Sequence, residues 1–324
     1  MYRRLLFVVL PLSFHLAVFS NPVQAEYPDK PIRFIVPFAP GGGSDFVARL
    51  LATKVTPGLG QQVIVDNRPG AGGLVGTQLA ARTTGDGYSL LLIDTPFSVN
   101  VSLYENANYD AVKDFAPITL VATVPLVLVV NPGVKATSVK EFIALAKTEQ
   151  GKLAMASGGA GGVAHLAGAL FTMVTGATFT HVPYKGIGPG MTAVAANEVP
   201  FMFATSQSAA TLMKSGRVKA LAVTSNSRSP AMQEIPTMKE AGVAGYEITN
   251  WYGVVSAAGM PAAVINRLHD EFVKALETQD VLERFAKVGL SVATSKSSAE
   301  FSAFVKAEVA KWAKVVKASG MKAE

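Results

Sequence analysis

From Tyr27 onward, short apolar runs alternate with segments in which apolar residues recur every three or four positions. The runs Ile32–Val36, Tyr88–Ile93 and Leu126–Val130 have the length and composition of buried strands. Helical spacing is clearest in the segment from Ser298 to Ser319, where it predicts an amphipathic helix docked on a core, through Phe301, Phe304, Val305, Val309, Trp312 and Val316. This alternation predicts an α/β fold with mostly parallel sheets and helices on both faces.

The same patterns predict most of the remaining elements. Further strands are expected at Val63–Val65, Phe115–Val121, Leu153–Ala156, Phe179–Pro183, Val199–Phe203, Ala220–Thr224 and Glu247–Ser256. A helix over about 138–149 begins with a capping box, because Glu141 stands three residues after Ser138. Other helices are expected after Asp45, through Gln78–Ala81, Val163–Val174 and Ala209–Ser215, after Gly186, and from Pro261 to Phe272. Asn100–Tyr109 reads as irregular, and Phe285–Val288 leads directly to Ser291-Val292.

One stretch, Ile32–Asp45, joins an apolar strand to a helix through three consecutive glycines, Gly41–Gly43. A strand, a glycine loop and a helix start bring unpaired backbone N–H groups and the positive end of a helix dipole to one point. Glycine also lets the backbone approach a ligand closely. The alternative is a tight turn in which Ser44 or Asp45 is the N-cap of the helix.

The second half of the chain repeats this arrangement. Leu153–Ala156 is followed by the glycine-rich loop Ser157–Gly162 and then by a helical stripe. Two such helix starts facing each other across a cleft would suit a carboxylate, provided that two lobes close around it and exclude water. The chain is expected to cross between these lobes near Pro125 and near Thr249.

Composition agrees with an ordered, two-domain chain. It has 324 residues, of which 49% are hydrophobic and 16% charged, and it contains no cysteine. The formal net charge of +6 falls to +4 if Arg3 and Arg4 are removed with a leader. The lysines are dispersed, so the basic stripe with interleaved aromatics that is typical of nucleic-acid binders is missing from the sequence.

The first 25 residues resemble a secretory signal peptide. Arg3 and Arg4 precede an apolar region, and Val23-Gln24-Ala25 fits signal-peptidase cleavage after Ala25. The alternative, an N-terminal membrane anchor, requires a longer uninterrupted apolar run. An exported chain without cysteine suits a bacterial periplasm.

Known catalytic and metal-binding patterns do not fit this sequence. His165, His181 and His269 lack a His or Cys at ligand spacing, so no metal site is expected. Ser44 and Ser157 do not stand in a Gly-x-Ser-x-Gly elbow, and no glycine loop carries the lysine of a P-loop. The match of the glycine loops to a dinucleotide fingerprint is poor. A binding protein without a cofactor is therefore expected, and an enzyme is the weakest of the alternatives.

Several motifs together resemble one family over essentially the whole chain after residue 25. VPFAPGGGSD, VDNRPGAGGLVG, KDFAPITLVATVPLVLVVNP, HLAGALF, HVPYKGIGP and RVKALAVTSNSRSPAMQEIPTMKEAG resemble the Bug family, the TctC-like periplasmic solute-binding proteins of tripartite tricarboxylate transporters. The resemblance implies a two-lobed periplasmic binding-protein fold of the type II, Venus flytrap class. Lobe 1 would comprise residues 26–125 and 250–324, and lobe 2 residues 126–249.

The family resemblance and the glycine loops together assign a set of ligand-binding positions. They are Phe38, Ala39, Pro40, Gly41, Gly42, Gly43, Ser44, Asp45, Leu74, Thr95, Ser157, Gly158, Gly159, Ala160, Gly161, Gly162, His165, Tyr184, Lys185, Gly186, Ala204 and Thr205. Two of these assignments have structural alternatives. His165 could instead cap its helix or bond a neighbouring loop, and Lys185 could belong to a polar turn.

The sequence departs from the family pattern at three places. Ala204-Thr205 stands where Asp-Asn is common, Leu74 where Asn is common, and Pro200 where an acid is common. Without an acid at Ala204, a ligand ammonium loses a partner, which favours a purely anionic or partly apolar acid. The resemblance implies a monomeric receptor that hands a small carboxylate to membrane transporter subunits. A periplasmic partner of a sensor kinase is the alternative.

Overall fold

The computed structural model describes residues 27–149, 151–184 and 186–321. The proposed signal peptide, with its cleavage site after Ala25, and Lys185 lie outside these ranges. The strands are β1 Ile32–Val36, β2 Val63–Asn67, β3 Ser89–Asp94, β4 Phe115–Val130, β5 Ala154–Ser157, β6 Thr180–Pro183, β7 Phe201–Thr205, β8 Lys219–Val223, β9 Thr249–Ala257 and β10 Ser291–Val292. The helices are α1 Gly43–Leu59, the 3-10 turn η1 Ala71–Gly73, α2 Leu74–Ala81, α3 Thr95–Leu103, α4 Val139–Glu149, α5 Val163–Thr175, α6 Ile187–Ala195, α7 Ser206–Lys214, α8 Ala262–Leu276, α9 Gln279–Lys287 and α10 Ser298–Ser319.

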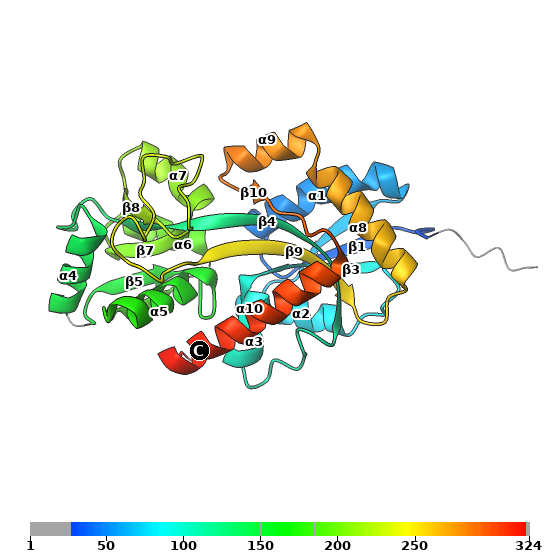
Figure 1. Cartoon of the computed structure of the whole chain (residues 1–324), viewed down its shortest axis with the longest axis horizontal. Helices are drawn as coiled ribbons and strands as arrows, with labels where there is room; N and C mark the ends of the chain where they lie inside the picture. Colours follow the sequence, from blue (N-terminus) through cyan, green and yellow to red (C-terminus); the bar gives the residue numbers. More distant parts are fainter. Residues whose placement is uncertain (1–26, 150, 185, 322–324) are drawn as a thin grey trace, which may run out of the picture.

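Two long strands run through both halves of the molecule (Figure 1). The strand order is β2-β1-β3-β9-β4-β7-β5-β6, with β8 and β10 also paired to β4. The sheet is mixed: β1 pairs in parallel with β2 and β3, whereas β9 is antiparallel to both β3 and β4. The expected α/β class is confirmed, and antiparallel β9 and β4 join the parallel strands of the two halves.

β4 changes partners at Pro125. Its first part pairs with β9, ending at the pair Pro125 and Thr249, and from Leu126 onward it pairs with β7 and β8. Proline has no backbone N–H to donate, so a change of ladder partner at this position leaves no donor unpaired. The two segments predicted as separate apolar runs are therefore one 16-residue strand.

Alternating side chains give each half of the sheet two apolar faces, as pleating requires. In the first half, Phe34 packs under α1 and α8, whereas its neighbour Ile35 packs with α2, α3 and α10. In the second half, Leu128 faces α4 and α5, and Val129 faces α6 and α7. Helices thus cover both faces of each half, as predicted.

Helix α10 links the two halves along one side (Figure 1). Phe301 and Val305, near its start, pack in the core of the first half, and Trp312 and Val316, near its end, pack in the core of the second. The amphipathic helix predicted for this segment is confirmed at Ser298–Ser319.

Two local predictions can be compared directly with the structure. The capping box of α4 is confirmed, because Ser138 Oγ accepts from the Glu141 N–H at 3.2 Å and Glu141 accepts from the Thr137 N–H at 2.7 Å. The irregular structure predicted for Asn100–Tyr109 is wrong at its start, since α3 continues to Leu103. Nearly every residue of α3 is buried, so this helix has no polar face to reveal its period. The short helix α9 was also not predicted.

The packing of α10 on β9 is tight at Gly253. A Cβ at this position would overlap the Phe301 ring, which is itself fully buried. Gly253→Ala is therefore expected to lower the free energy of unfolding by about 2 kcal/mol, the usual size of an overpacking penalty. Urea unfolding monitored by circular dichroism measures this change in the free energy of unfolding.

Gly188→Ala is the matched control, because a Cβ at Gly188 in α6 would have no heavy atom within 4 Å. It is expected to change stability by less than about 0.5 kcal/mol. Equal destabilisation by both substitutions would contradict the packing described here.

Candidate ligand-binding site

The carboxyl ends of the parallel strands in the two halves point toward the same place. Asp94, the last residue of β3, pairs with Tyr252, three residues from Thr249 in the crossing strand β9. Thr205, the last residue of β7, pairs with Leu126, next to Pro125. Both sets of strand ends therefore meet at the crossing, where open α/β sheets commonly bind ligands.

In the first half, α1 begins without a side-chain cap. Gly42 is the N-cap residue and makes no side-chain cap hydrogen bond, so the alternative that Ser44 or Asp45 is the N-cap is wrong. A Cβ at Gly43 would lie 2.8 Å from the Tyr252 hydroxyl and 3.1 Å from Gln207 Oε1. Only glycine fits between this helix start and the crossing strand.

Asp45 shapes the first loop. Its carboxylate accepts from the Gly41 N–H at 3.0 Å, from Asn67 Nδ2 at 2.9 Å and from Arg49 Nε at 2.9 Å. Burial alone raises the pKa of Asp45, but the hydrogen bonds from Arg49, Gly41 and Asn67 outweigh it and leave that pKa below its ordinary value. The carboxylate is thus ionised and already engaged with the protein.

In the second half, Ser157 organises the loop before α5. Its hydroxyl lies 2.5 Å from His181 Nε2 and accepts from the Gly159 N–H at 3.1 Å. Gly159 and Gly161 have φ of +124° and +71°, which side chains rarely adopt. Gly162 is the N-cap of α5 and likewise makes no side-chain cap hydrogen bond.

His165 supports this loop from behind. Its ring stacks on that of His181 with centroids 3.7 Å apart, and Nδ1 accepts from the Gly161 N–H at 3.3 Å. Burial, together with the charge of His181, lowers the pKa of His165 to about 4. The alternative expected for His165, a hydrogen bond to a neighbouring loop, is the contact that the structure contains.

Several helix starts around the crossing share one property. The side chains that the structure describes provide no cap hydrogen bond to the first turns of α1, α3, α5 and α6. By contrast, Thr205 caps α7 at the crossing, and the first N–H groups of α2 already donate to the carbonyls of Ala71 and Gly70. Away from the crossing, Ser297 caps α10, whereas α8 and α9 also lack a side-chain cap. Uncapped first turns leave backbone N–H groups and positive dipole ends available to an anion.

Buried polar groups lie between these helix starts. Thr95 and Asn250 are 0% and 3% exposed, and Thr95 Oγ1 and Asn250 Oδ1 have no hydrogen-bond partner among the described residues. Burial raises the pKa of Asp94 well above its ordinary value, which favours the neutral acid. Burial also raises the pKa of Tyr252. Burial thus favours the neutral forms of Asp94 and Tyr252, and the hydrogen-bonding capacity of this cluster is not fully used.

The glycine-rich loop of the second half touches the first half directly. A Cβ at Gly161 would overlap Leu103 and lie 3.5 Å from Asn100 Oδ1. A Cβ at Gly72 would lie 3.1 Å from the carbonyl oxygen of Ala160. The two halves therefore meet at this loop.

The other positions assigned from the sequence have varied surroundings. Leu74 packs in the apolar core, and Ala204 is fully buried among apolar side chains of β7. Tyr184 is half-buried, and its N–H donates to the Ser157 carbonyl at 2.9 Å. Gly186 is the N-cap of α6, Ala39–Gly42 are exposed, and Gly158 and Ala160 are half-buried.

The sequence patterns do not assign Asn100, Asn250, Tyr252 or Gln207 to the binding site. Asn100 lies in a segment that the patterns predict to be irregular, and Gln207 is the second residue of α7. Asn250 and Tyr252 flank Trp251 in the largely buried strand β9. The sequence signal for Asn250 and Tyr252 is their position as polar residues inside a buried strand, because buried polar groups need hydrogen-bond partners.

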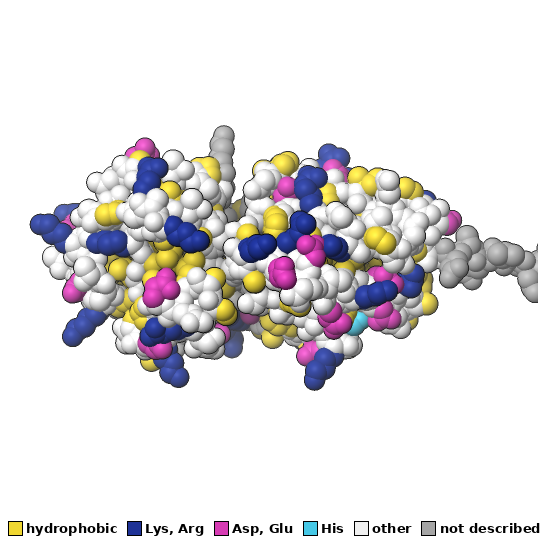
Figure 2. Space-filling view, turned by 90° about the horizontal axis from the view of Figure 1, so that it is seen from above, with side chains coloured by type: hydrophobic (Ala, Val, Ile, Leu, Met, Phe, Trp, Pro, Cys, Tyr) yellow, Lys and Arg dark blue, Asp and Glu magenta, His cyan; other side chains and the backbone are white. Residues whose placement is uncertain are grey.

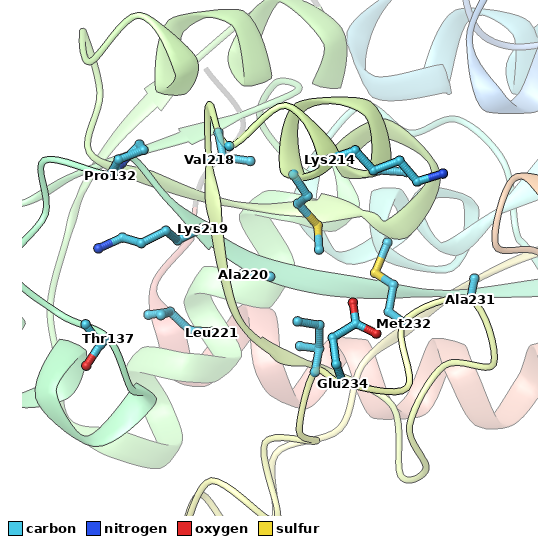
Figure 3. Close-up of a pocket in the computed structure, with 14 residues that line it drawn as sticks. Pro132, Thr137, Lys214, Val218, Lys219, Ala220, Leu221, Ala231, Met232 and Glu234 are labelled. Atoms are coloured by element: carbon cyan, nitrogen blue, oxygen red, sulfur yellow. The ribbon is translucent and has the colours of Figure 1, made fainter.

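Among the described residues, two surface pockets stand out, and neither of them joins the two glycine-rich loops. One, of about 670 Å³, lies beside β8 and α7 and is lined by residues such as Lys219, Leu221 and Met232 (Figure 3). The other, of about 510 Å³, lies between α1 and α9, with Gly41, Gly42 and Asp45 in its lining. Lysine and arginine side chains are scattered over the face shown in Figure 2 and interleaved with acidic ones.

Within residues 27–149, 151–184 and 186–321, no group of three or more His, Asp or Glu residues is arranged to hold a metal ion. Over the same ranges, no helix combines the length and apolarity needed to cross a bilayer.

The His165 contacts generate a pH prediction. Unfolded histidine titrates near pH 6.5, and folded His165 near pH 4, so between these values the unfolded state binds more protons. The free energy of unfolding is expected to fall by on the order of 3 kcal/mol as the pH drops from 6.5 to 4. The side chain in His165→Asn can still accept from the Gly161 N–H, but it does not titrate in this pH range. The free energy of unfolding of this variant should therefore fall less than that of the wild type as the pH drops.

Urea unfolding at pH 8 and pH 5 measures the effect. Wild type and His165→Asn are expected to be similar at pH 8 and to diverge at pH 5, where the variant is the more stable. Equal free energies of unfolding for the wild type and His165→Asn at both pH 8 and pH 5 would contradict the buried, neutral state of His165.

Comparisons with known proteins agree with the fold described above. Residues 47–321 match the TctC family, described as the tripartite tricarboxylate transporter family receptor. The solved structure of the periplasmic binding protein BugD is 36% identical, with a TM-score of 0.83, and the match covers 91% of this chain and 99% of that one. Rpa4515 of R. palustris, solved with adipate, is 30% identical, with a TM-score of 0.85 and 92% and 99% coverage. MatC of Rhodopseudomonas palustris, solved with bound malate, is 28% identical, with a TM-score of 0.83 and 90% and 100% coverage.

These likenesses confirm the two-lobed periplasmic binding-protein fold and the family predicted from the sequence. They also confirm the prediction of a solute-binding protein rather than an enzyme. The chain belongs to the TctC family of receptors.

Proposed function

We propose that this protein binds a small organic carboxylate between its two lobes and delivers it to the membrane subunits of a tripartite tricarboxylate-type transporter. The observation that carries the proposal is the group of uncapped helix starts around the crossing, together with unpartnered buried oxygens such as Thr95 Oγ1. The malate and adipate in the structures of MatC and Rpa4515 support a carboxylate as the ligand class.

Backbone N–H groups would hold the anion in this site. Asp94 is favoured in its neutral form, and Asp45 is already bonded to Arg49, Asn67 and Gly41, so neither opposes a carboxylate strongly. Hydrogen bonds to a charged acceptor contribute about 1.5–3 kcal/mol each. Three or four of them, less the cost of ordering, reach the ~8 kcal/mol of micromolar binding if water is excluded.

Closure of the two lobes would exclude that water. We place the lobe boundaries at residues 26–125 with 250–324, and at 126–249, because the paired residues Pro125 and Thr249 mark the change of strand partners. Small backbone rotations near this pair would move one lobe against the other. Positions from Phe38 to Asp45 and from Ser157 to His165 would then close on the ligand.

Export supports the same function. The N-terminal 25 residues have the pattern of a signal peptide, and cleavage after Ala25 would release the chain into the periplasm. A receptor there captures its ligand before transport, which requires binding but no chemical conversion.

Isothermal titration of the cleaved protein with a panel of di-, tri- and monocarboxylates, malate and adipate included, tests the proposed function. At least one acid is expected to bind with a dissociation constant of about 10 μM or below. Absence of binding across the panel would contradict the proposal.

Gly42→Val tests where the carboxylate binds. A Cβ at Gly42 would have only the Ala39 carbonyl oxygen within 4 Å, at 3.7 Å, so the fold should tolerate the change. The valine side chain would occupy the approach to the α1 start, and affinity is expected to fall about 100-fold, equivalent to about 3 kcal/mol. The melting temperature without ligand should change by less than about 3 °C.

Ala231→Val is the control, because Ala231 lines the other pocket (Figure 3) and is exposed. It should leave the affinity unchanged. Loss of binding in Ala231→Val but not in Gly42→Val would move the site to that pocket.

A further inference from the structure

The amide of Asn100 presents an acceptor without a partner. Its Nδ2 donates to the Gly72 carbonyl at 3.1 Å, and its side chain also hydrogen bonds the Tyr109 hydroxyl. The carbonyl oxygen of Gly72 can only accept a hydrogen bond, so the Asn100 atom that faces it must be the amide nitrogen, Nδ2. Asn100 Oδ1 is left with no hydrogen-bond partner among the described residues, in a side chain that is 0% exposed.

This oxygen lies where the two lobes meet. It is 4.0 Å from the position that a Cβ of Gly72 would occupy and 3.5 Å from that of Gly161. Gly72 belongs to the first lobe and Gly161 to the glycine-rich loop of the second. The Tyr104 hydroxyl lies 3.6 Å from the same Gly72 position. One glycine from each lobe thus approaches the buried acceptor closely.

A buried acceptor requires a donor, since leaving it unpaired costs about 1–3 kcal/mol. A carboxylate cannot supply this donor, because both of its oxygens are acceptors. A ligand that satisfies Asn100 Oδ1 must therefore carry a hydroxyl or an ammonium in addition to its carboxylate.

The charges around the site favour the hydroxyl. Burying an ammonium requires an ionised partner. Asp94 is favoured in its neutral form, and the carboxylate of Asp45 is occupied by Arg49 and two further donors. A hydroxyl needs no such partner.

We propose that Asn100 makes this protein selective for hydroxy acids: Asn100 Oδ1 accepts a hydrogen bond from a ligand hydroxyl while the helix starts hold the carboxylate. This assignment rests on the proposed function and adds a substrate class to it. A site built to bond a hydroxyl discriminates strongly against the analogue that lacks it, because the buried group is then left unpaired.

Matched acids test the class in the wild-type protein. The pairs are malate and succinate, lactate and propionate, and citrate and tricarballylate, in which each member has the same carbon skeleton and number of carboxyl groups. Isothermal titration is expected to give the hydroxy member about tenfold or tighter affinity in every pair that binds. Affinities within about twofold would mean that water serves Asn100 equally well, and would overturn the proposal. Tighter binding of aspartate than of malate would also overturn it.

Asn100→Ala tests the residue, with Asn106→Ala as the control at an exposed asparagine of the same segment. The affinity ratio within a pair should fall to about one in Asn100→Ala and stay at the wild-type value in Asn106→Ala. A preference that survives in Asn100→Ala would overturn the assignment. Asn100→Leu, which fills the space of the amide, repeats the test if the alanine variant unfolds.

The outcomes separate the two proposals. Equal binding of both members of a pair leaves the proposed function intact and overturns only the role of Asn100. No binding of any acid contradicts the proposed function and overturns the role of Asn100 with it.

Discussion

The first turn of an α-helix has N–H groups that the helix itself cannot satisfy, and this constraint underlies the site. At α7 and α10 a side chain caps the turn, whereas at α1 and α5 glycine stands at the N-cap and the described side chains provide no cap. The uncapped turns of α1 and α5 begin near the crossing, where the strand ends of both lobes meet. In the proposed function, a ligand anion would replace the missing caps there.

The fold brings these helix starts together through β4 and β9. Each lobe has its own apolar faces, and the two strands that pass between the lobes pair at Pro125 and Thr249. Helix α10 packs on both cores. In the proposed closure, movement of one lobe against the other would occur at this crossing. Gly161 beside Asn100 and Leu103 marks where the lobes come into contact.

Much of the fold could be read from the sequence, because strand runs, glycine-rich loops and the capping box at Ser138 depend on local patterns. The helix α3 could not, since burial on all sides removes the polar face that reveals a period. The role of Asn100 could not be predicted either, because its importance comes from tertiary contacts with Gly72 and Gly161. Tyr252 is a polar residue in a buried strand, which is a signal in the sequence, but its contact with Gly43 is tertiary. The roles of Asp45 and His165 were likewise decided by tertiary hydrogen bonds to Asn67 and Gly161.

The most direct measurement is a ¹⁵N NMR titration of the cleaved protein with malate. If helix starts from both lobes bind the carboxylate, the largest changes in amide chemical shift should come from Gly41–Ser44 and from Gly158–Ala164. Both groups should reach half of their full shift at the same malate concentration. Shifts confined to one loop, or to Lys219 and Met232 beside the other pocket, would contradict a carboxylate held between the two lobes.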